Sequence, residues 1–359
     1  MNFNYPQWID VSSHTYALLA LVLNGLIAIL WHQKIYKKLG LKTYEAIQRI
    51  HLAETPRLGG LILLFVLAIY TWLHAETKLA FILKPCLISI IPLSLVALKE
   101  DLFHDVTPVT RLVGLFGSGY LFVVNFSGPY PLIEKTFSAP WFKNPLALVI
   151  FYPLALTGLA NGSNLTDGVN GLCSVIFLSI LGSLLFLAYQ VSDNTIMMAI
   201  WMLMILIATF LSLNYPWGKI FLGDLGAYAI AFLTGLFTII FFGRHPEISC
   251  WFAVLILIYP MTEVAFSMAR RYFRGQSIFS ADTKHLHIKI FYFLRKIPQL
   301  RSYANPTVMP LLSILWLYPL ITIPWAFKKP TLTLFFILLF WTIYFILYRV
   351  APNPQEKNV

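Results

Sequence analysis

The sequence predicts an all-α polytopic membrane protein with about eleven transmembrane helices. Of its 359 residues, 58% are hydrophobic and only 11% are charged, and the mean hydropathy is +0.74. This composition leaves too little polar surface to coat a water-soluble protein of that size. The apolar residues also gather in stretches of roughly 20, which is the length that a helix needs to cross the hydrocarbon core.

These stretches follow one another without a soluble insertion, so residues 1–359 are expected to form a single integral membrane domain. The first stretch has no basic flank and no small-residue cleavage site before it, which indicates a retained helix rather than a signal peptide. Apolar stretches predict the spans near 14–32, 58–74, 79–98, 112–127, 146–160, 171–190, 195–213, 225–242, 249–268, 307–326 and 331–349.

The distribution of positive charge predicts the orientation. The loops 33–57, 99–111, 161–170, 214–224 and 269–306 and the tail from Arg349 carry nineteen Lys and Arg residues, whereas the opposite loops carry six. The positive-inside rule therefore places the first set in the cytoplasm, the N-terminus outside and the C-terminus in the cytoplasm. This topology also accounts for the net charge of +11, and no nucleic-acid partner is expected.

Carboxylates mark the same side of the membrane. Nine of the fifteen Asp and Glu residues fall in the predicted cytoplasmic segments: Glu45, Glu54, Glu100, Asp101, Asp105, Asp167, Asp224, Asp282 and Glu356. The acids of KEDLFHDVTPVTRL (99–112) directly follow the third span. They are either a solvated loop or ligands of a hard cation such as Mg²⁺, which prefers carboxylate oxygens and substrate phosphates.

Two further segments combine an acid with glycine and amide side chains. NGSNLTDGVNGL (161–172) contains Asn164, Asp167 and Asn170, and is far richer in polar and glycine residues than a connecting turn requires, which indicates contact with a ligand. In NYPWGKIFLGDLGAYA (214–229), Asp224 lies between two glycines at the N-terminal end of the eighth predicted helix. It either caps that helix or helps to bind a metal-bound phosphate at the helix N-terminus.

The remaining polar segments are basic. The loop around ADTKHLHIKIF (281–291) holds His285 and His287 among many Lys and Arg residues, which favours a phosphate-rich ligand over zinc. HLAETPRLGG (51–60) places His51 and Arg57 before a pair of glycines, where Arg57 is either a membrane anchor or a phosphate-binding fork. Glu263, within a predicted span, is either structural or lines the site.

These five motifs, in this order over roughly residues 40–295, resemble the polyprenyl-phosphate N-acetylhexosamine-1-phosphate transferases, the WecA/MraY-type family. Two positions depart from the family pattern, because Glu100 stands in the usual pair of Asp residues and Asn170 replaces the second Asp of the Asn-Asp-Gly loop. The sequence His-Leu-His-Ile also lacks a second His directly after His287. That difference favours the WecA-like branch over the muramyl-pentapeptide branch.

The resemblance implies a reaction and its substrates. A UDP-N-acetylhexosamine would give its sugar-1-phosphate to polyprenyl (undecaprenyl) phosphate and release UMP, as the first step of a lipid-linked glycan pathway. The enzyme would lie in the bacterial inner membrane with its active site facing the cytoplasm, and a homodimer is left open. The alternatives are a phospho-N-acetylmuramoyl-pentapeptide transferase, a catalytically silent homologue and a secondary transporter, although a transporter would carry its polar site at the midplane.

The resemblance also implies roles for individual residues. Mg²⁺, with Mn²⁺ as the alternative, would be held by Asp224 and Asn164 with Asp167 nearby. Asp101, together with Glu100, would engage the acceptor phosphate. The implied substrate-binding residues are Arg57, His285 and His287 for the diphosphate, Asn170 for the uracil, Asn214 as support for the metal loop, and His51.

Overall fold

The computed structural model describes residues 21–23, 25, 26, 55–131, 145–277 and 284–353. Within these ranges the chain forms helices and turns and no strand, which confirms the all-α prediction. The helices are α2 (Gly59–Leu73), α3 (Lys78–Ser89), α4 (Ile91–Phe103), α5 (Pro108–Asn125), α6 (Pro145–Thr166), α7 (Leu172–Gln190), α8 (Asn194–Asn214), α9 (Gly223–Arg244), α10 (Trp251–Ile256), α11 (Ile258–Phe273), α12 (Leu286–Arg295), η4 (Pro298–Leu300), α13 (Ala304–Leu311), α14 (Ser313–Trp316), α15 (Tyr318–Lys328) and α16 (Leu332–Val350).

Five of these helices, α6, α7, α8, α9 and α16, are long and apolar enough to cross a membrane. The number rises to seven if α3 with α4, and α13 with α14 and α15, each count as one bent span. Every predicted span from 58–74 onward coincides with a helix or a broken helix, whereas 14–32 lies mostly outside the described residues. The membrane character is thus confirmed, and the total of eleven spans stays a prediction.

The predicted span 79–98 is broken near its middle, where α3 and α4 meet at an angle of 53°. Pro92 at the start of α4 cannot donate a backbone hydrogen bond, so the helix cannot continue its ladder through this point. The amide of Leu93 donates instead to Oγ of Ser118 on α5, at 2.9 Å. A neighbouring hydroxyl therefore satisfies a backbone group that would otherwise be left without a partner in an apolar environment.

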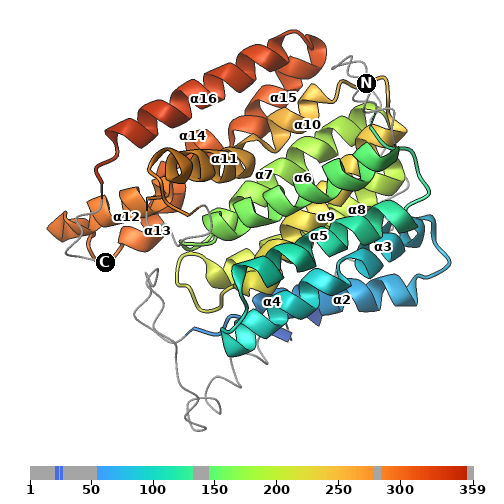
Figure 1. Ribbon diagram of the computed structural model, residues 1–359, viewed down its shortest axis with the longest axis horizontal. Helices are drawn as coiled ribbons and strands as arrows, with labels where there is room; N and C mark the ends of the chain where they lie inside the picture. The colour runs from blue at the N-terminus through green and yellow to red at the C-terminus, as the bar shows by residue number, and fades with distance from the viewer. Residues whose placement is uncertain (1–20, 24, 27–54, 132–144, 278–283, 354–359) are drawn as a thin grey trace, which may run out of the picture.

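Helix α9 lies at the centre of the bundle and packs against α2, α4, α6, α7 and α8 (Figure 1). Its membrane-crossing segment is completely buried inside the protein. Glycine allows α2 to approach it closely, because a Cβ atom on Gly60 would lie only 2.1 Å from Cα of Gly226. This contact fixes the N-terminal ends of α2 and α9 side by side.

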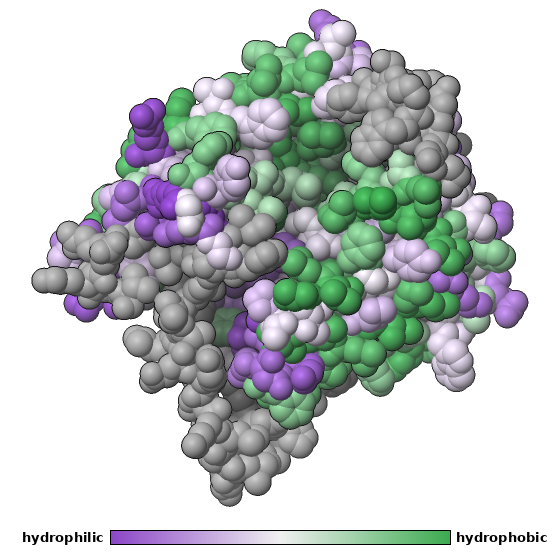
Figure 2. All heavy atoms as spheres, in the orientation of Figure 1, coloured by the Kyte–Doolittle hydropathy of each residue, from purple (hydrophilic) through white to green (hydrophobic). Residues whose placement is uncertain are grey.

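The outer helices present apolar side chains to their surroundings. In α16, at the edge of the bundle, only 22% of the membrane-crossing segment is buried (Figure 1). Phe65 on α2 and Phe81 on α3 are 63% and 85% exposed. Apolar side chains cover much of the flank visible in Figure 2, and hydrophilic ones gather toward its ends. This pattern suits a protein whose flanks face lipid.

The helices extend further than the hydropathy predicts and take over parts of the expected loops. Helix α4 continues to Phe103 and α6 to Thr166, so Asp101 and Asn164 stand on terminal helical turns rather than in loops. The expected loop 269–306 likewise contains α12. Helical geometry therefore fixes the direction of several candidate site residues.

Candidate active site

The N-terminus of α9 is held by a carboxylate from another helix. Oδ1 of Asp101, on the last turn of α4, accepts a hydrogen bond from N–H of Asp224 at 2.8 Å, and Oδ2 accepts one from N–H of Leu225 at 2.9 Å. Leu222, at the position before α9, makes no side-chain capping bond. Asp101 thus satisfies two of the free amides at the start of α9 and places its carboxyl group at the positive end of the helix dipole.

Gly223 makes this arrangement sterically possible. Its φ angle is +72°, and a Cβ atom at this position would lie 2.2 Å from the carbonyl oxygen of Arg57 and 2.5 Å from Oδ2 of Asp101. Only glycine combines this backbone conformation with such close contacts. The glycine that precedes Asp224 in the motif therefore has a direct steric role.

The motif around Arg57 packs directly against the motif around Asp224. N–H of Phe221 donates to the carbonyl of Pro56 at 2.9 Å, and the amides of Gly59 and Gly60 donate to the carbonyls of Phe221 and Leu222 at 3.0 and 2.9 Å. This pairing brings Nη2 of Arg57 within 3.5 Å of Oδ1 of Asp224. Two motifs that are far apart in the sequence thus form one surface.

Asp224 lies at the centre of the cluster and is nearly buried. Its Oδ1 accepts a hydrogen bond from Nδ2 of Asn164 at 3.1 Å, and Nη1 of Arg111 lies 3.5 Å from its Oδ2. Both guanidinium contacts, from Arg57 and Arg111, are longer than the 2.7–2.9 Å of a strong charge-assisted hydrogen bond. The two arginines therefore neutralise Asp224 while keeping donors for another anion.

Arg111 is a site residue that the sequence analysis did not single out. Its Nη2 bonds Oε1 of Glu100 at 2.7 Å, and the other oxygen of Glu100 accepts a hydrogen bond from N–H of Val106 at 3.0 Å. Glu100 thus stabilises the turn between α4 and α5 and also fixes the position of the Arg111 guanidinium group. A signal was present in the sequence, because Pro108 starts a new helix shortly after Glu100 and a tight hairpin brings the start of α5 back beside the end of α4.

Asp167 follows α6 and lies among the same charges. Burial, with smaller contributions from Asp224 and Asp101, raises the pKa of its carboxyl to about 8, while Arg57 acts in the opposite direction. A carboxyl with a pKa this close to neutral can exchange a proton at physiological pH. Backbone amides occupy both oxygens of Asp101, so Asp167 is the better suited of these two acids to proton transfer.

Asn170 and Asn214 organise the loops beneath the cluster. Asn214 accepts a hydrogen bond from N–H of Gly171 at 2.6 Å and donates to the carbonyl of Ile220 at 2.8 Å, so it ties the loop after α6 to the loop before α9. Asn170 donates to the carbonyl of Pro216 at 2.9 Å. Its buried Oδ1 has no hydrogen-bond partner among the described residues, which leaves one acceptor for a ligand.

The histidine motif lies beside this cluster rather than within it. His285 and His287 are almost fully buried, and Nδ1 of His285 lies 3.3 Å from Oε2 of Glu263. His287 packs against Gly168, where a Cβ atom would lie 2.6 Å from its Nε2. Burial lowers the pKa of His287 to about 4, so its ring is neutral at physiological pH. His51 lies outside the described residues.

The oxygen atoms around Asp224 suit Mg²⁺ that is bound partly by substrate phosphate, rather than a metal ion bound by protein side chains alone. The part of the chain that the structure describes contains no group of three or more His, Cys, Asp or Glu side chains that could hold a metal ion. Mg²⁺, however, commonly takes one or two carboxylates and completes its shell with phosphate oxygens and water. Asp224, whose buried Oδ2 makes no hydrogen bond to the described residues, and the amide oxygen of Asn164 fit that requirement.

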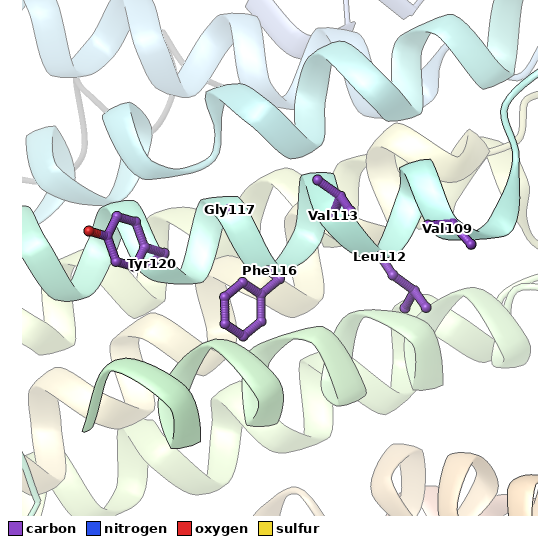
Figure 3. A pocket seen from close by; sticks show the side chains of 6 residues that line it. All are labelled: Val109, Leu112, Val113, Phe116, Gly117 and Tyr120. Carbon is purple, nitrogen blue, oxygen red and sulfur yellow. The ribbon is translucent and has the colours of Figure 1, made fainter. Parts of the chain in front are cut away.

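An apolar groove of about 470 Å³ lies on another face of α5. It is lined by Val109, Leu112, Val113, Phe116, Gly117 and Tyr120, all on this one helix (Figure 3). The spacing of these residues places them on the side of α5 opposite Arg111. The groove is therefore separate from the charged cluster.

Comparisons with known proteins cover most of the residues of this cluster. The model of the family described as Glycosyl transferase family 4 matches residues 83–242, a range that includes Glu100, Asp101, Asp167 and Asp224. A probable undecaprenyl-phosphate N-acetylglucosaminyl 1-phosphate transferase of Bacillus subtilis is 24% identical over 73% of this chain and 72% of its own length. An undecaprenyl-phosphate alpha-N-acetylglucosaminyl 1-phosphate transferase of Thermotoga maritima is 28% identical over 70% and 72%.

A phospho-N-acetylmuramoyl-pentapeptide-transferase of Streptococcus pneumoniae is 24% identical over 66% of this chain and 74% of its own length. The relatives thus include both kinds of enzyme that the motifs distinguish. Together with the family match, they confirm the resemblance that the five motifs indicated.

Proposed function

We infer that this chain, a transferase of the WecA/MraY type, moves N-acetylhexosamine-1-phosphate from a UDP-sugar to undecaprenyl phosphate and releases UMP. The observation that carries the proposal is the convergence of Asp101, Asp167, Arg57 and Arg111 on Asp224 from four different segments. Acidic side chains that can hold a cation stand here beside guanidinium groups that can bind phosphate. Phosphoryl transfer requires this combination, because it depends mainly on positioning and on neutralising phosphate oxygens.

We propose that eleven spans hold the enzyme in the bacterial inner membrane, with the N-terminus outside and both the C-terminus and the active site on the cytoplasmic side. The excess of Lys and Arg in the loops 33–57, 99–111 and 269–306 supports this orientation. A lipid phosphate can present its head group only at the membrane interface, while a nucleotide sugar arrives from the cytosol. A site at the helix ends would bring the two together.

We propose that Asp224 and the amide oxygen of Asn164 hold Mg²⁺, or alternatively Mn²⁺. A bound cation would neutralise oxygens of the transferring phosphoryl group. Arg57, whose side chain is 46% exposed, and Arg111 would bind the remaining phosphate oxygens. The free Oδ1 of Asn170 is the acceptor proposed for the uracil, and Asn214 would keep the surrounding loops in place.

The roles of the acids differ from those that the resemblance implies. Both oxygens of Asp101 are occupied by backbone amides, so we assign it to positioning α9. Asp167, whose pKa of about 8 lies close to neutral pH, is instead the proposed proton-transfer residue. Little base catalysis is needed, because a phosphate monoester with a second pKa of about 6 is already largely ionised at neutral pH.

The second candidate function is that of a phospho-N-acetylmuramoyl-pentapeptide transferase, which the similarity to the Streptococcus pneumoniae enzyme favours. The two functions differ in the sugar nucleotide. The absence of a second His directly after His287 supports the N-acetylhexosamine reaction.

The test uses the purified full-length protein in detergent with undecaprenyl phosphate and Mg²⁺. Labelled UDP-N-acetylglucosamine, UDP-N-acetylgalactosamine and UDP-N-acetylmuramoyl-pentapeptide are supplied separately, and lipid-linked product is measured with and without EDTA. We expect product from a UDP-N-acetylhexosamine, loss of product with EDTA or Asp224→Asn, and retention in Asp105→Asn, whose side chain is 55% exposed. Failure to form lipid product from either UDP-N-acetylhexosamine, or full activity of Asp224→Asn, would contradict the proposal.

A further inference from the structure

A carboxylate and two imidazoles lie buried together beside the active site. Glu263 on α11 is 1% exposed, and His285 and His287, at the start of α12, are 2% and 0% exposed. Nδ1 of His285 lies 3.3 Å from Oε2 of Glu263, and the two imidazole rings stack with centroids 5.7 Å apart and an angle of 11° between their planes. Three polar side chains of this kind are costly to bury unless they interact with one another or with a ligand.

The contact with Glu263 fixes the orientation of the His285 ring. A carboxylate can only accept, so Nδ1 of His285 must carry the proton in this bond. Nε2, at the opposite side of the ring, is buried and has no hydrogen-bond partner in the ranges that the structure describes. The pair therefore presents one uncommitted nitrogen whose position is set by a carboxylate behind it.

This pair connects to the active site through His287 and Gly168. His287 stacks on His285 and touches Gly168, the residue that follows Asp167. Of the two imidazoles, only His285 has a carboxylate within hydrogen-bond distance among the described residues. The stacked imidazoles thus contact the loop that carries Asp167.

We propose that Glu263 is a positioning residue for the transfer reaction, which holds the imidazolium of His285 through Nδ1 so that Nε2–H donates to a phosphate oxygen of the nucleotide. The inference rests on the proposed function and adds to it a residue that never touches substrate. A carboxylate behind a histidine commonly fixes both the tautomer and the direction of the ring. At metal-bound histidines, loss of such an outer partner lowers metal affinity or activity about 10- to 100-fold, and we expect an effect of similar size here.

A purely structural role for Glu263 predicts different experimental results. In that case the carboxylate would serve the packing of α11, and its removal would lower stability without a selective effect on catalysis. Tyr259 provides the matched control, since it lies one turn earlier on the same helix, is equally buried and has a hydroxyl without a hydrogen-bond partner among the described residues. Among the described residues, the titratable groups that face Glu263 besides the two histidines include Tyr259 itself and Tyr344 of α16.

The experiment compares Glu263→Gln, Glu263→Asp, His285→Gln and Tyr259→Phe in the full-length protein in detergent. Thermal unfolding, kcat and KM for the UDP-sugar are measured, and ¹⁵N NMR of histidine-labelled protein reports the protonation of the His285 ring, assigned from its absence in His285→Gln. We expect Glu263→Gln to lower kcat/KM at least tenfold and to change the ¹⁵N signals of His285. Glu263→Asp should recover part of the activity, and Tyr259→Phe should behave like the wild type.

Two results would overturn the inference while leaving the proposed function intact. One is wild-type kcat/KM in Glu263→Gln. The other is a lower kcat/KM in Glu263→Gln without any change in the ¹⁵N signals of His285, together with a loss of thermal stability that Tyr259→Phe shows to the same extent. A wild-type protein that forms no lipid product would instead contradict the proposed function itself, so the two failures can be told apart.

Discussion

Asp101 accepts hydrogen bonds from the backbone amides of Asp224 and Leu225, 123 and 124 residues further along the chain. The contact performs the task of an N-terminal cap, although the side chain comes from another helix. It joins the acidic motif at the end of α4 to the Gly-Asp motif at the start of α9. The position of Asp224 therefore depends on Asp101 even without a shared ligand.

Asp101→Asn should weaken this joint. The amide keeps the size of the side chain but has one acceptor oxygen, and its NH₂ group would face a backbone N–H. We expect a loss of about 1–3 kcal/mol in the free energy of unfolding, together with a lower kcat. Thermal unfolding and the lipid-product assay measure both, with the exposed Asp105→Asn as control. An unchanged melting temperature and kcat in Asp101→Asn would show that the cap is dispensable.

Arg111→Lys tests whether the site needs only a positive charge at this position or also the planar shape of the guanidinium group. Lysine keeps the positive charge but cannot span Glu100 and Asp224 as the planar guanidinium does. The loss of a charge-assisted hydrogen bond of about 1.5–3 kcal/mol corresponds to a decrease of roughly 10- to 100-fold in kcat/KM. Steady-state kinetics with the UDP-sugar measure this, with Lys99→Arg, at a 56% exposed side chain, as control. Activity equal to the wild type would remove Arg111 from the site.

Gly223→Ala and Gly275→Ala together test the close packing before Asp224. Both glycines have a positive φ, +72° and +65°, so both substitutions strain the backbone by about 1–2 kcal/mol. Only at Gly223 would the new Cβ atom collide with the carbonyl of Arg57, because nothing lies within 4 Å at Gly275. We expect activity to be lost only in Gly223→Ala. Equal activity of the two variants would show that the contact with Arg57 does not matter.

Asp167 should make the stability of the metal-free protein depend on pH. Its folded pKa of about 8 lies above the unfolded value of about 3.9, so the folded state binds the proton more tightly. This stabilisation is complete below about pH 4 and is lost as the pH rises through about 8. The melting temperature in EDTA should fall between pH 6 and 8.5, with a smaller fall in Asp167→Asn. Equal slopes in the two proteins would contradict the assignment.

The sequence predicted the helical membrane fold, because hydropathy is a local property, and it identified the motifs whose residues meet at Asp224. It did not predict that Asp101 caps α9 or that Arg111 reaches Asp224. Both contacts depend on how α4, α5 and α9 pack, which no local pattern encodes. The break at Pro92 was also missed, since the hydropathy of 79–98 stays high across it while the lost backbone bond is supplied by Ser118.

The histidine motif shows a similar limit. The basic loop with two histidines indicated a phosphate-rich ligand, but not that His285 and His287 are almost fully buried and that the first contacts Glu263. The loop charge gave no sign of this burial, because the partner carboxylate lies 22 residues earlier, inside a predicted span.

The complete burial of the α9 span has a consequence for how the enzyme responds to its bilayer. A membrane that becomes thicker or thinner acts on the helices whose side chains touch its acyl chains, and these tilt or stretch to match it. Helix α16 and the exposed faces of α2 and α3 would absorb that mismatch. Asp224, at the end of a helix without lipid contact, would keep its place as growth temperature or lipid composition changes.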